Sequence, residues 1–243
     1  MANTPADINR IIEALGELVD DFSRFWDDQG NPEPDNGNSP AVLIETMLNL
    51  LEILYNHETG DQELSSNELS KLGDYGLNLL DALEVDTQTI DYPSHQLFGD
   101  LAFPLALWLA RNDSDIEELG PVVNALARMA NRLTHPEELE RLFIQSGEII
   151  EAISPRVLQD LEQTEEGAPW SVLLLNRSII ATRTLKPELM EMAFSVLSEN
   201  LPTAAPMFFT EAMEQMELLD YPPQVRAVVE RYFNDWGDSK LLH

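Results

Sequence analysis

The chain lacks cysteine altogether and has only three lysines and four histidines among its 243 residues. Without cysteine it can form no disulfide, no thiolate metal site and no cysteine nucleophile, a composition that fits a reducing cytosol. The residues that follow Met1 also show neither the basic region nor the apolar region of a secretory signal. We therefore expect a cytoplasmic protein.

The signatures of common catalytic and cofactor-binding sites are missing as well. The sequence contains no GxSxG nucleophile turn, no GxxxxGK[ST] phosphate loop, no GxGxxG dinucleotide turn and no HExxH zinc motif. Pairs of carboxylates occur throughout so acidic a chain, so their presence does not point to a glycosidase or an aspartic dyad. We expect no catalytic residue, no cofactor and no metal, and hence no enzyme.

Two short stretches come nearest to a metal site or a catalytic site. Their residues are His57, Glu58, Asp61 and Glu63 in the first, and Asp91, His95 and Asp100 in the second. The first stretch offers nitrogen and oxygen ligands but not the ligand spacing of a calcium-binding EF-hand. In the second, a histidine four residues after an aspartate can hydrogen-bond to it at a helix start. We interpret the first as a solvated acidic loop and the second as a structural cap.

Long hydrophobic runs and strand patterns are also absent. The most apolar stretch, residues 101–110, is about half as long as a bilayer-spanning helix. No segment alternates apolar and polar residues over a convincing length, so no β-sheet is predicted. Apolar residues instead recur at three- and four-residue spacing along nearly the whole chain, which predicts an all-α, multi-helical fold.

What the chain has in abundance is negative charge. Its 44 aspartates and glutamates face 14 lysines and arginines, which gives a formal charge of −30. Such a surface repels phosphate backbones and anionic lipid heads, so direct nucleic-acid binding and membrane docking are excluded as leading hypotheses. Because 44% of the residues are hydrophobic, the charge indicates an acidic surface on a folded core and not disorder. The negative charge fits either a halophilic type of composition or an acidic surface that engages a basic partner or imitates a nucleic acid. The carboxylates are spread along the whole chain and not gathered in one block, which favours the first explanation.

Proline and capping residues mark the expected helix boundaries. Starts are expected at Thr4 with Pro5, Ser39 with Pro40, Ser65 with Glu68, Ser114 with Glu117, and Ser154 with Pro155. We expect an acidic N-terminal region of three helices over residues 1–85, a connector over residues 85–93, and a helical-repeat region over residues 86–243. Helices of the second region are expected over residues 95–111, 115–133, 136–151, 155–163, 169–184, 187–200, 205–219 and 223–236.

A weak internal repeat of 51 residues runs through the second region. The residues that recur at this spacing are Pro104, Pro155 and Pro206, and the pairs Pro136 and Pro187, Glu140 and Glu191, and Phe143 and Phe194. A fixed period of about this size is typical of α-solenoids. We therefore predict three-helix units stacked as in HEAT or armadillo repeats, with an irregular helical bundle as the alternative.

Two groups of residues are candidates for binding a partner. Six of the eleven arginines fall in the third helix of each proposed unit, namely Arg128, Arg132, Arg177, Arg183, Arg226 and Arg231. Aligned on one face they would grip carboxylates or an acidic peptide, although in so acidic a chain neutralising carboxylates on neighbouring helices is the favoured role. The second group is Met207, Phe208 and Phe209, because methionine-rich surfaces adapt to varied partners, although helical spacing favours core packing.

The function hypothesis that follows is a non-catalytic helical scaffold or adaptor that binds another protein. A dedicated chaperone or escort that shields a client segment is the first alternative, and exposure of Met207, Phe208 and Phe209 would favour it. An acidic mimic that blocks a nucleic-acid-binding protein is the second alternative. All three rest on architecture and on the absence of catalytic motifs, which is an associational argument.

Overall fold

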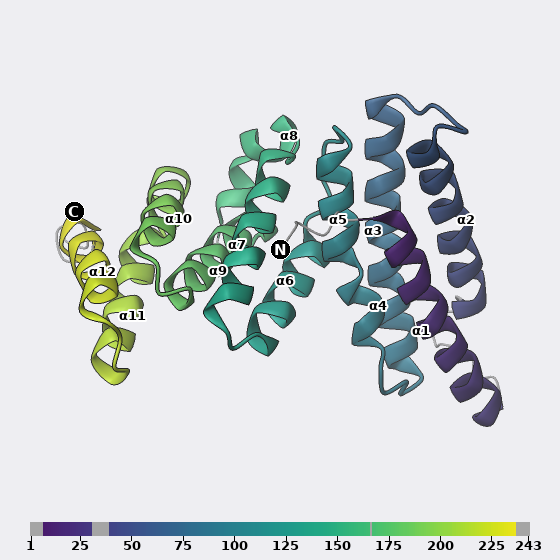
Figure 1. Cartoon of the computed structure of the whole chain (residues 1–243), viewed down its shortest axis with the longest axis horizontal. Coiled ribbons are helices and arrows are strands. Elements are labelled where there is room, and N and C mark those ends of the chain that lie inside the picture. Colours follow the sequence, from purple (N-terminus) through teal and green to yellow (C-terminus); the bar gives the residue numbers. More distant parts are fainter. Residues whose placement is uncertain (1–6, 31–38, 166, 237–243) are drawn as a thin grey trace. The chain divides into compact units, whose positions relative to one another are not determined.

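The structure is a computed structural model that describes residues 7–30, 39–165 and 167–236. Within these residues the predicted all-α class is confirmed, since the only extended pairing is an isolated β-bridge between Ile116 and Ile153 (Figure 1). The helices are α1 (Ile8–Asp28), α2 (Pro40–Thr59), α3 (Ser66–Thr89), α4 (Gln96–Asp100), α5 (Ala102–Arg111), α6 (Gly120–Arg132), α7 (Pro136–Glu151), α8 (Pro155–Gln159), the 3-10 helix η1 (Leu161–Thr164), α9 (Pro169–Arg183), α10 (Pro187–Asn200), α11 (Ala205–Leu218) and α12 (Pro223–Trp236).

Many helix starts lie where the sequence predicts them. Helices α2, α7, α8, α9, α10 and α12 each begin at a proline, whose fixed φ and missing N–H suit the first helical position. Ser65 and Glu68 form the predicted capping box of α3, in which Glu68 Oε2 accepts a hydrogen bond of 2.9 Å from the Ser65 N–H. Hydrogen bonds from Ser65 lower the pKa of Glu68. The predicted Thr4 cap lies outside the described residues, and α1 begins at Ile8 with Asp7 as its N-cap.

The predicted helix start at Ser114 and Glu117 is wrong, because the next helix, α6, begins only at Gly120. The reason is a long-range contact. Asp74 of α3 accepts hydrogen bonds of 3.0 Å at its Oδ1 from the backbone N–H groups of both Glu117 and Glu118. These N–H groups are thus satisfied by a side chain of another helix and not by a capping box.

The connector predicted over residues 85–93 is also wrong in its first half, since α3 continues to Thr89. Threonines are poor helix formers, but the Thr87 hydroxyl donates to the Leu83 carbonyl at 2.5 Å and the Thr89 hydroxyl to the Asp86 carbonyl at 2.7 Å. The single helix predicted over residues 95–111 is divided into α4 and α5.

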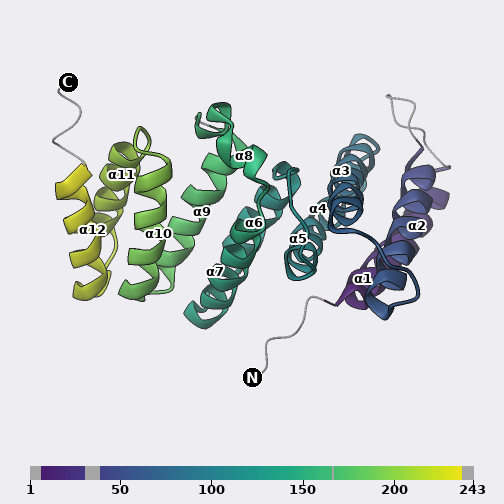
Figure 2. The same ribbon diagram turned by 90° about the horizontal axis from the view of Figure 1, so that it is seen from above.

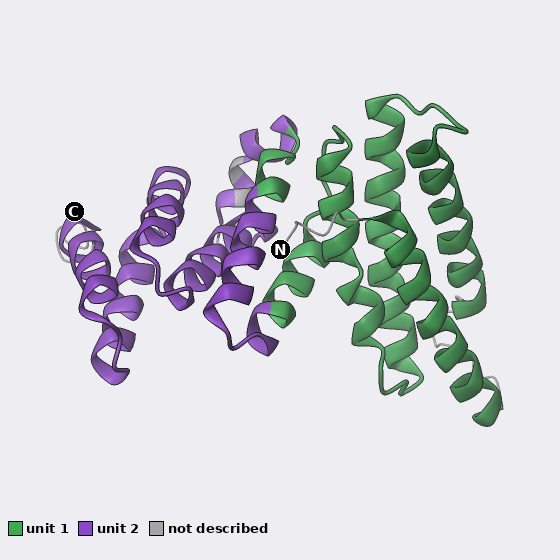
Figure 3. Cartoon of the chain, in the orientation of Figure 1, with its two compact units in different colours: residues 1–129, 148–154 green, residues 130–147, 155–243 purple. Residues whose placement is uncertain are grey.

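The chain divides into two compact units (Figure 3). Unit 1 comprises Met1–Met129 and Glu148–Ser154, and unit 2 comprises Ala130–Gly147 and Pro155–His243. The boundary predicted near residue 85 falls inside α3, which packs on α4 and α5 within unit 1.

Unit 1 is built around α3, which packs on α2, α4 and α5, while α1 packs on α2, α4 and α5. Its core includes an aromatic cluster in which the Phe22 ring lies edge-on to Tyr92 and Phe98, with centroid separations of 5.2 and 6.1 Å. The Tyr92 hydroxyl donates a hydrogen bond of 2.8 Å to Asp21 Oδ2. Burial, together with this carboxylate, raises the pKa of Tyr92 to about 12. The cluster therefore anchors α1 to the turn that precedes α4.

Unit 2 has α10 at its centre, packed on α9 and α12, with α11 packed on α12 (Figure 2). The buried Phe194 of α10 makes edge contacts with Phe208 and Phe209 of α11 and with Tyr232 of α12, with ring centroids 5.2 to 5.8 Å apart. This aromatic cluster fixes the three C-terminal helices of the unit to one another.

Some positions that the sequence relates by 51 residues have similar surroundings within unit 2. Phe143 and Phe194 are both buried, and both contact a side chain of a later helix. Glu140 binds Lys186, with 2.6 Å between Oε1 and Nζ, and its counterpart Glu191 binds an arginine of α12. This similarity is compatible with the predicted repeat, and stacking of three-helix units stays a prediction.

Candidate protein-binding groove of unit 2

Two adjoining hollows lie between α9 and α11, one of about 320 Å³ and one of about 610 Å³. Phe208 and Glu211 line both of them, so the two form one surface depression, which we call the α9–α11 groove. Its walls carry Leu175 and Ile179 from α9, and Met207, Phe208, Glu211 and Glu214 from α11.

The two walls of the groove run in the same direction. At the smaller hollow, Ser171 near the start of α9 lies with Ala204 at the start of α11. At the larger hollow, Arg183 at the end of α9 lies with Gln215 near the end of α11. The groove therefore extends from the N-terminal ends to the C-terminal ends of both helices.

The walls of the groove expose large apolar side chains. Met207 is 55% exposed and Ile179 is 47% exposed, whereas Phe208 is only 9% exposed. Phe209, the third residue of the predicted Met/Phe group, is fully buried in the aromatic cluster. The structure thus divides that group between the exposed wall, the groove floor and the core.

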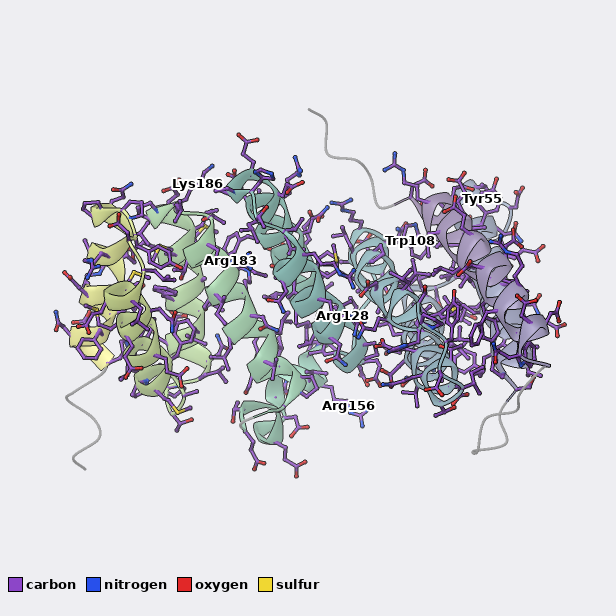
Figure 4. All side chains as sticks on the ribbon, turned by 90° about the horizontal axis from the view of Figure 1, so that it is seen from below. Tyr55, Trp108, Arg128, Arg156, Arg183 and Lys186 are labelled. Carbon is purple, nitrogen blue, oxygen red and sulfur yellow. The ribbon has the colours of Figure 1, made fainter. Side chains whose placement is uncertain are left out.

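The charge of the groove is acidic. Glu211 and Glu214 of α11 are exposed on one wall. Arg183 is the lining cation, but its guanidinium is held by backbone carbonyls, with Nη1 2.7 Å from the Ala130 oxygen and Nη2 2.6 Å from the Leu133 oxygen (Figure 4 labels Arg183). These carbonyls stand at the C-terminal end of α6, where a cation is favourable. The Arg183 donors are therefore engaged within the protein, while the two carboxylates face outward.

Arg128, the predicted partner-binding arginine of unit 1, is tied to two carboxylates. Its Nη1 and Nη2 each lie 3.0 Å from a Glu84 oxygen, and its Nε lies 2.6 Å from Asp100 Oδ1. Burial raises the pKa of Glu84, and the Arg128 charge opposes that shift without cancelling it. This arrangement joins α3, α4 and α6. It matches the expectation that the arginines neutralise carboxylates on neighbouring helices.

The other predicted arginines belong to unit 2 and are not brought together as a free strip of donors. Arg177 is 7% exposed and its guanidinium carbon lies 4.0 Å from the centroid of the Phe143 ring, whereas Arg132 is exposed. Arg226 donates a hydrogen bond to the Met216 carbonyl, and Arg231 pairs with Glu191. A role for these side chains toward a partner stays a prediction.

The His57 stretch has a structural explanation. His57 Nδ1 accepts a hydrogen bond of 3.2 Å from the Leu64 N–H, and Glu58 Oε1 accepts one of 2.6 Å from the Trp108 indole. Across the described ranges, no group of three or more His, Cys, Asp or Glu side chains is placed to hold a metal ion.

The Asp91 stretch does not converge on a common site either. His95 Nδ1 lies 2.9 Å from the Tyr92 carbonyl oxygen, and Asp100 binds Arg128. Asp91 has a φ of 59°, which places it in a left-handed turn after α3. Each of these polar groups therefore serves the local fold.

Sequence reasoning missed Leu175, Ile179, Glu211 and Glu214 as groove residues. A signal for the α9 wall is present in the sequence, because the apolar residues of α9 lie all round the helix and not on one stripe. A helix with apolar residues on every side needs cover on every side. In the structure one of these sides, that of Leu175 and Ile179, faces the groove.

Among the described helices, none combines the length and the hydropathy needed to cross a lipid bilayer. Comparison of the chain with protein-family models, with curated proteins and with solved structures finds no match.

Proposed function

We propose that the chain is a non-catalytic helical adaptor that binds an apolar segment of another protein in the α9–α11 groove. The observation that carries the proposal is the exposure of Met207 at the smaller hollow and of Ile179 at the larger hollow, with Phe208 lining both. Apolar surface removed from water contributes about 25 cal/mol per Å², and apolar side chains gathered at a hollow are typical of binding sites. A cytoplasmic location, consistent with the absence of cysteine, belongs to the same proposal.

The chemistry of the lining supports a binding role over a catalytic one. The described groove side chains include hydroxyl, carboxylate, amide and guanidinium groups, but neither histidine nor cysteine. Histidine is the commonest general base, and an activated nucleophile needs a base within hydrogen-bond reach. The Thr182 hydroxyl is already engaged, since it donates a hydrogen bond of 3.0 Å to the Ser178 carbonyl.

The escort hypothesis is the second candidate, and the exposure of Met207 favours it. The burial of Phe208 and Phe209 reduces the apolar surface that could shield a client. The two functions differ in outcome: an escort suppresses aggregation of its isolated client at equal molar amounts, whereas an adaptor binds a partner that stays soluble alone.

Selection of a displayed random-peptide library on the immobilised chain tests the proposed function. Selected peptides are then measured against Met207→Asp and against Met192→Asp, because Met192 is also 55% exposed but does not line the groove. We expect Met207→Asp to weaken binding by roughly tenfold or more, since a charge would be buried against apolar groups, and Met192→Asp to leave it unchanged. Equal binding by the two variants, or a selection that enriches nothing, would refute the groove as the binding site.

A further inference from the structure

We propose that the occupant of the α9–α11 groove is an amphipathic helix of about three turns that carries lysine or arginine side chains at the end where Glu211 and Glu214 stand. This inference rests on the proposed function and specifies its partner chemically. Three properties of the groove lead to it: its length, its walls and its distribution of charge.

The length of the groove matches a short helix. Lining residues extend along α9 from Ser171 to Arg183, a span of roughly 18 Å at 1.5 Å per helical residue. On α11 they extend over a similar span, from Ala204 to Gln215. A bound helix of about 12 residues would reach from one end to the other. The hollows of about 320 and 610 Å³ are large enough for several side chains each but not for a whole helix, so the helix would insert one face and lie along the rim.

The walls of the groove favour a helix over an extended segment. Both walls are helices, whose own backbone groups are hydrogen-bonded internally and offer no free strand edge. An extended segment laid against Leu175, Ile179 and Met207 would turn its N–H and C=O groups toward apolar side chains without partners. A helix satisfies these groups itself and presents side chains at three- and four-residue spacing to such a wall.

The distribution of charge specifies basic side chains on that helix. Glu211 and Glu214 lie at the larger hollow, and the donors of the nearby Arg183 are held by backbone carbonyls. At the end of α11 the Met216 carbonyl is already engaged by Arg226, so Glu211 and Glu214 carry the negative charge of this hollow. The smaller hollow shares Glu211, but its other polar lining residues among those described, such as Ser171 and Thr203, are uncharged. A lysine or arginine of the partner therefore gains most at the larger hollow, within a chain whose formal charge is −30.

A charge-exchange experiment tests this inference. Three fluorescent peptides of about 14 residues share one leucine face and differ only in carrying arginine, glutamine or glutamate at the flanking positions. Binding is measured by anisotropy to the unaltered chain, to Glu211→Arg/Glu214→Arg, and to the matched control Glu217→Arg/Glu230→Arg. Both double variants change the net charge equally, but Glu217 and Glu230 are exposed outside the groove lining. Circular dichroism checks that each variant is folded.

We expect the unaltered chain and the control variant to bind the arginine peptide roughly tenfold more tightly than the glutamate peptide. The groove variant should reverse that order, and peptide helicity should rise on binding. Equal preferences in the two double variants would show attraction by overall charge and would overturn the inference. So would binding without a rise in helicity.

The proposed function and this inference fail separately. If library-selected peptides bind in a Met207-dependent way while exchange of Glu211 and Glu214 changes no preference, the groove is a binding site but the basic helix is not its occupant. If neither selected nor designed peptides show Met207-dependent binding, both proposals are refuted.

Discussion

The Glu84 carboxylate occupies the space that a side chain on Gly99 would need. A β-carbon built on Gly99 would lie 1.6 Å from Glu84 Oε2, far inside van der Waals contact. Glu84 is held in that position by Arg128, whose two terminal nitrogens each lie 3.0 Å from one of its oxygens. The absence of a side chain at position 99 is thus a condition for this ion pair.

Replacing Gly99 by alanine should therefore displace the Glu84 carboxylate and weaken its pairing with Arg128. We expect Gly99→Ala to lower the free energy of unfolding by about 1–3 kcal/mol, measured by denaturant titration. Gly16→Ala is the control, because a β-carbon at this helical position of α1 meets nothing within 4 Å. It should raise the free energy of unfolding by about 0.5–1 kcal/mol. A Gly99→Ala variant as stable as the unaltered chain would show that the carboxylate can move without cost.

Asp74 should make the stability depend on pH in a defined direction. Burial raises the pKa of Asp74 above its ordinary value of 3.8, although the N–H groups of Glu118 and Glu117 act to lower it. The resulting stabilisation is complete below that ordinary value and is lost as the pH rises through the raised pKa. Relative to Asp74→Asn, the unaltered chain should therefore lose free energy of unfolding as the pH rises above about 4.

Glu13→Gln, which removes an exposed carboxylate, controls for the loss of one charge in that experiment. Parallel pH profiles for the unaltered chain and Asp74→Asn would contradict the assignment of the shift to Asp74.

Arg183 should stabilise unit 2 through the shape of its guanidinium and not only through its charge. It donates to the Ala130 and Leu133 carbonyls at 2.7 and 2.6 Å, a pair of contacts that a lysine ammonium does not reproduce. We expect Arg183→Lys to lower the free energy of unfolding by about 1–2 kcal/mol. Arg24→Lys is the control, because the Arg24 side chain is 76% exposed, and its effect should stay within about 0.5 kcal/mol. Equal effects of the two substitutions would refute the bracing role.

If carboxylate repulsion strains the folded chain, its melting temperature should rise steeply between low and molar sodium chloride. The formal charge of −30 is the source of that repulsion, and salt screens it. In a chain of this size each kcal/mol regained corresponds to about 2–4 °C in Tm. Sucrose, which is excluded from protein surfaces but does not screen charge, separates screening from general stabilisation. A flat response to salt would favour the explanation that the acidic surface serves a partner.

The helices of unit 2 were predictable to the residue where local signals set them. Helix α10 spans residues 187–200 and α12 spans residues 223–236, as the sequence predicts, because each begins at a proline and carries a periodic apolar face. The segment after Ser114 was not predictable in this way. Its conformation depends on Asp74, which lies 43 residues before Glu117 in the sequence. A capping pattern read locally cannot include such a contact.

The candidate groove was less predictable than the helices around it. Met207, Phe208 and Phe209 are consecutive, yet Met207 is exposed at the groove, Phe208 lines the groove but is nearly buried, and Phe209 is fully buried. Whether each of these side chains is exposed or buried depends on which sides of α11 are covered by α10 and α12, and this is a property of tertiary packing. Likewise, the positions of the arginines can be read from the sequence, but whether each guanidinium contacts a carbonyl, an aromatic ring or a carboxylate cannot.

Several basic side chains bind groups of the protein itself, and this affects how ions distribute around the molecule. Arg111, Arg128 and Lys186 each bind carboxylates of their own unit, and Arg183 binds carbonyls. Other basic side chains, Arg24 and Arg132 among them, are exposed, but the formal charge of −30 leaves carboxylates in large excess, so mobile cations gather around the protein as a loose atmosphere. A basic partner displaces some of these ions into bulk solution when it docks. Part of the partner's affinity then comes from the entropy of the released ions, and this part decreases as the salt concentration rises.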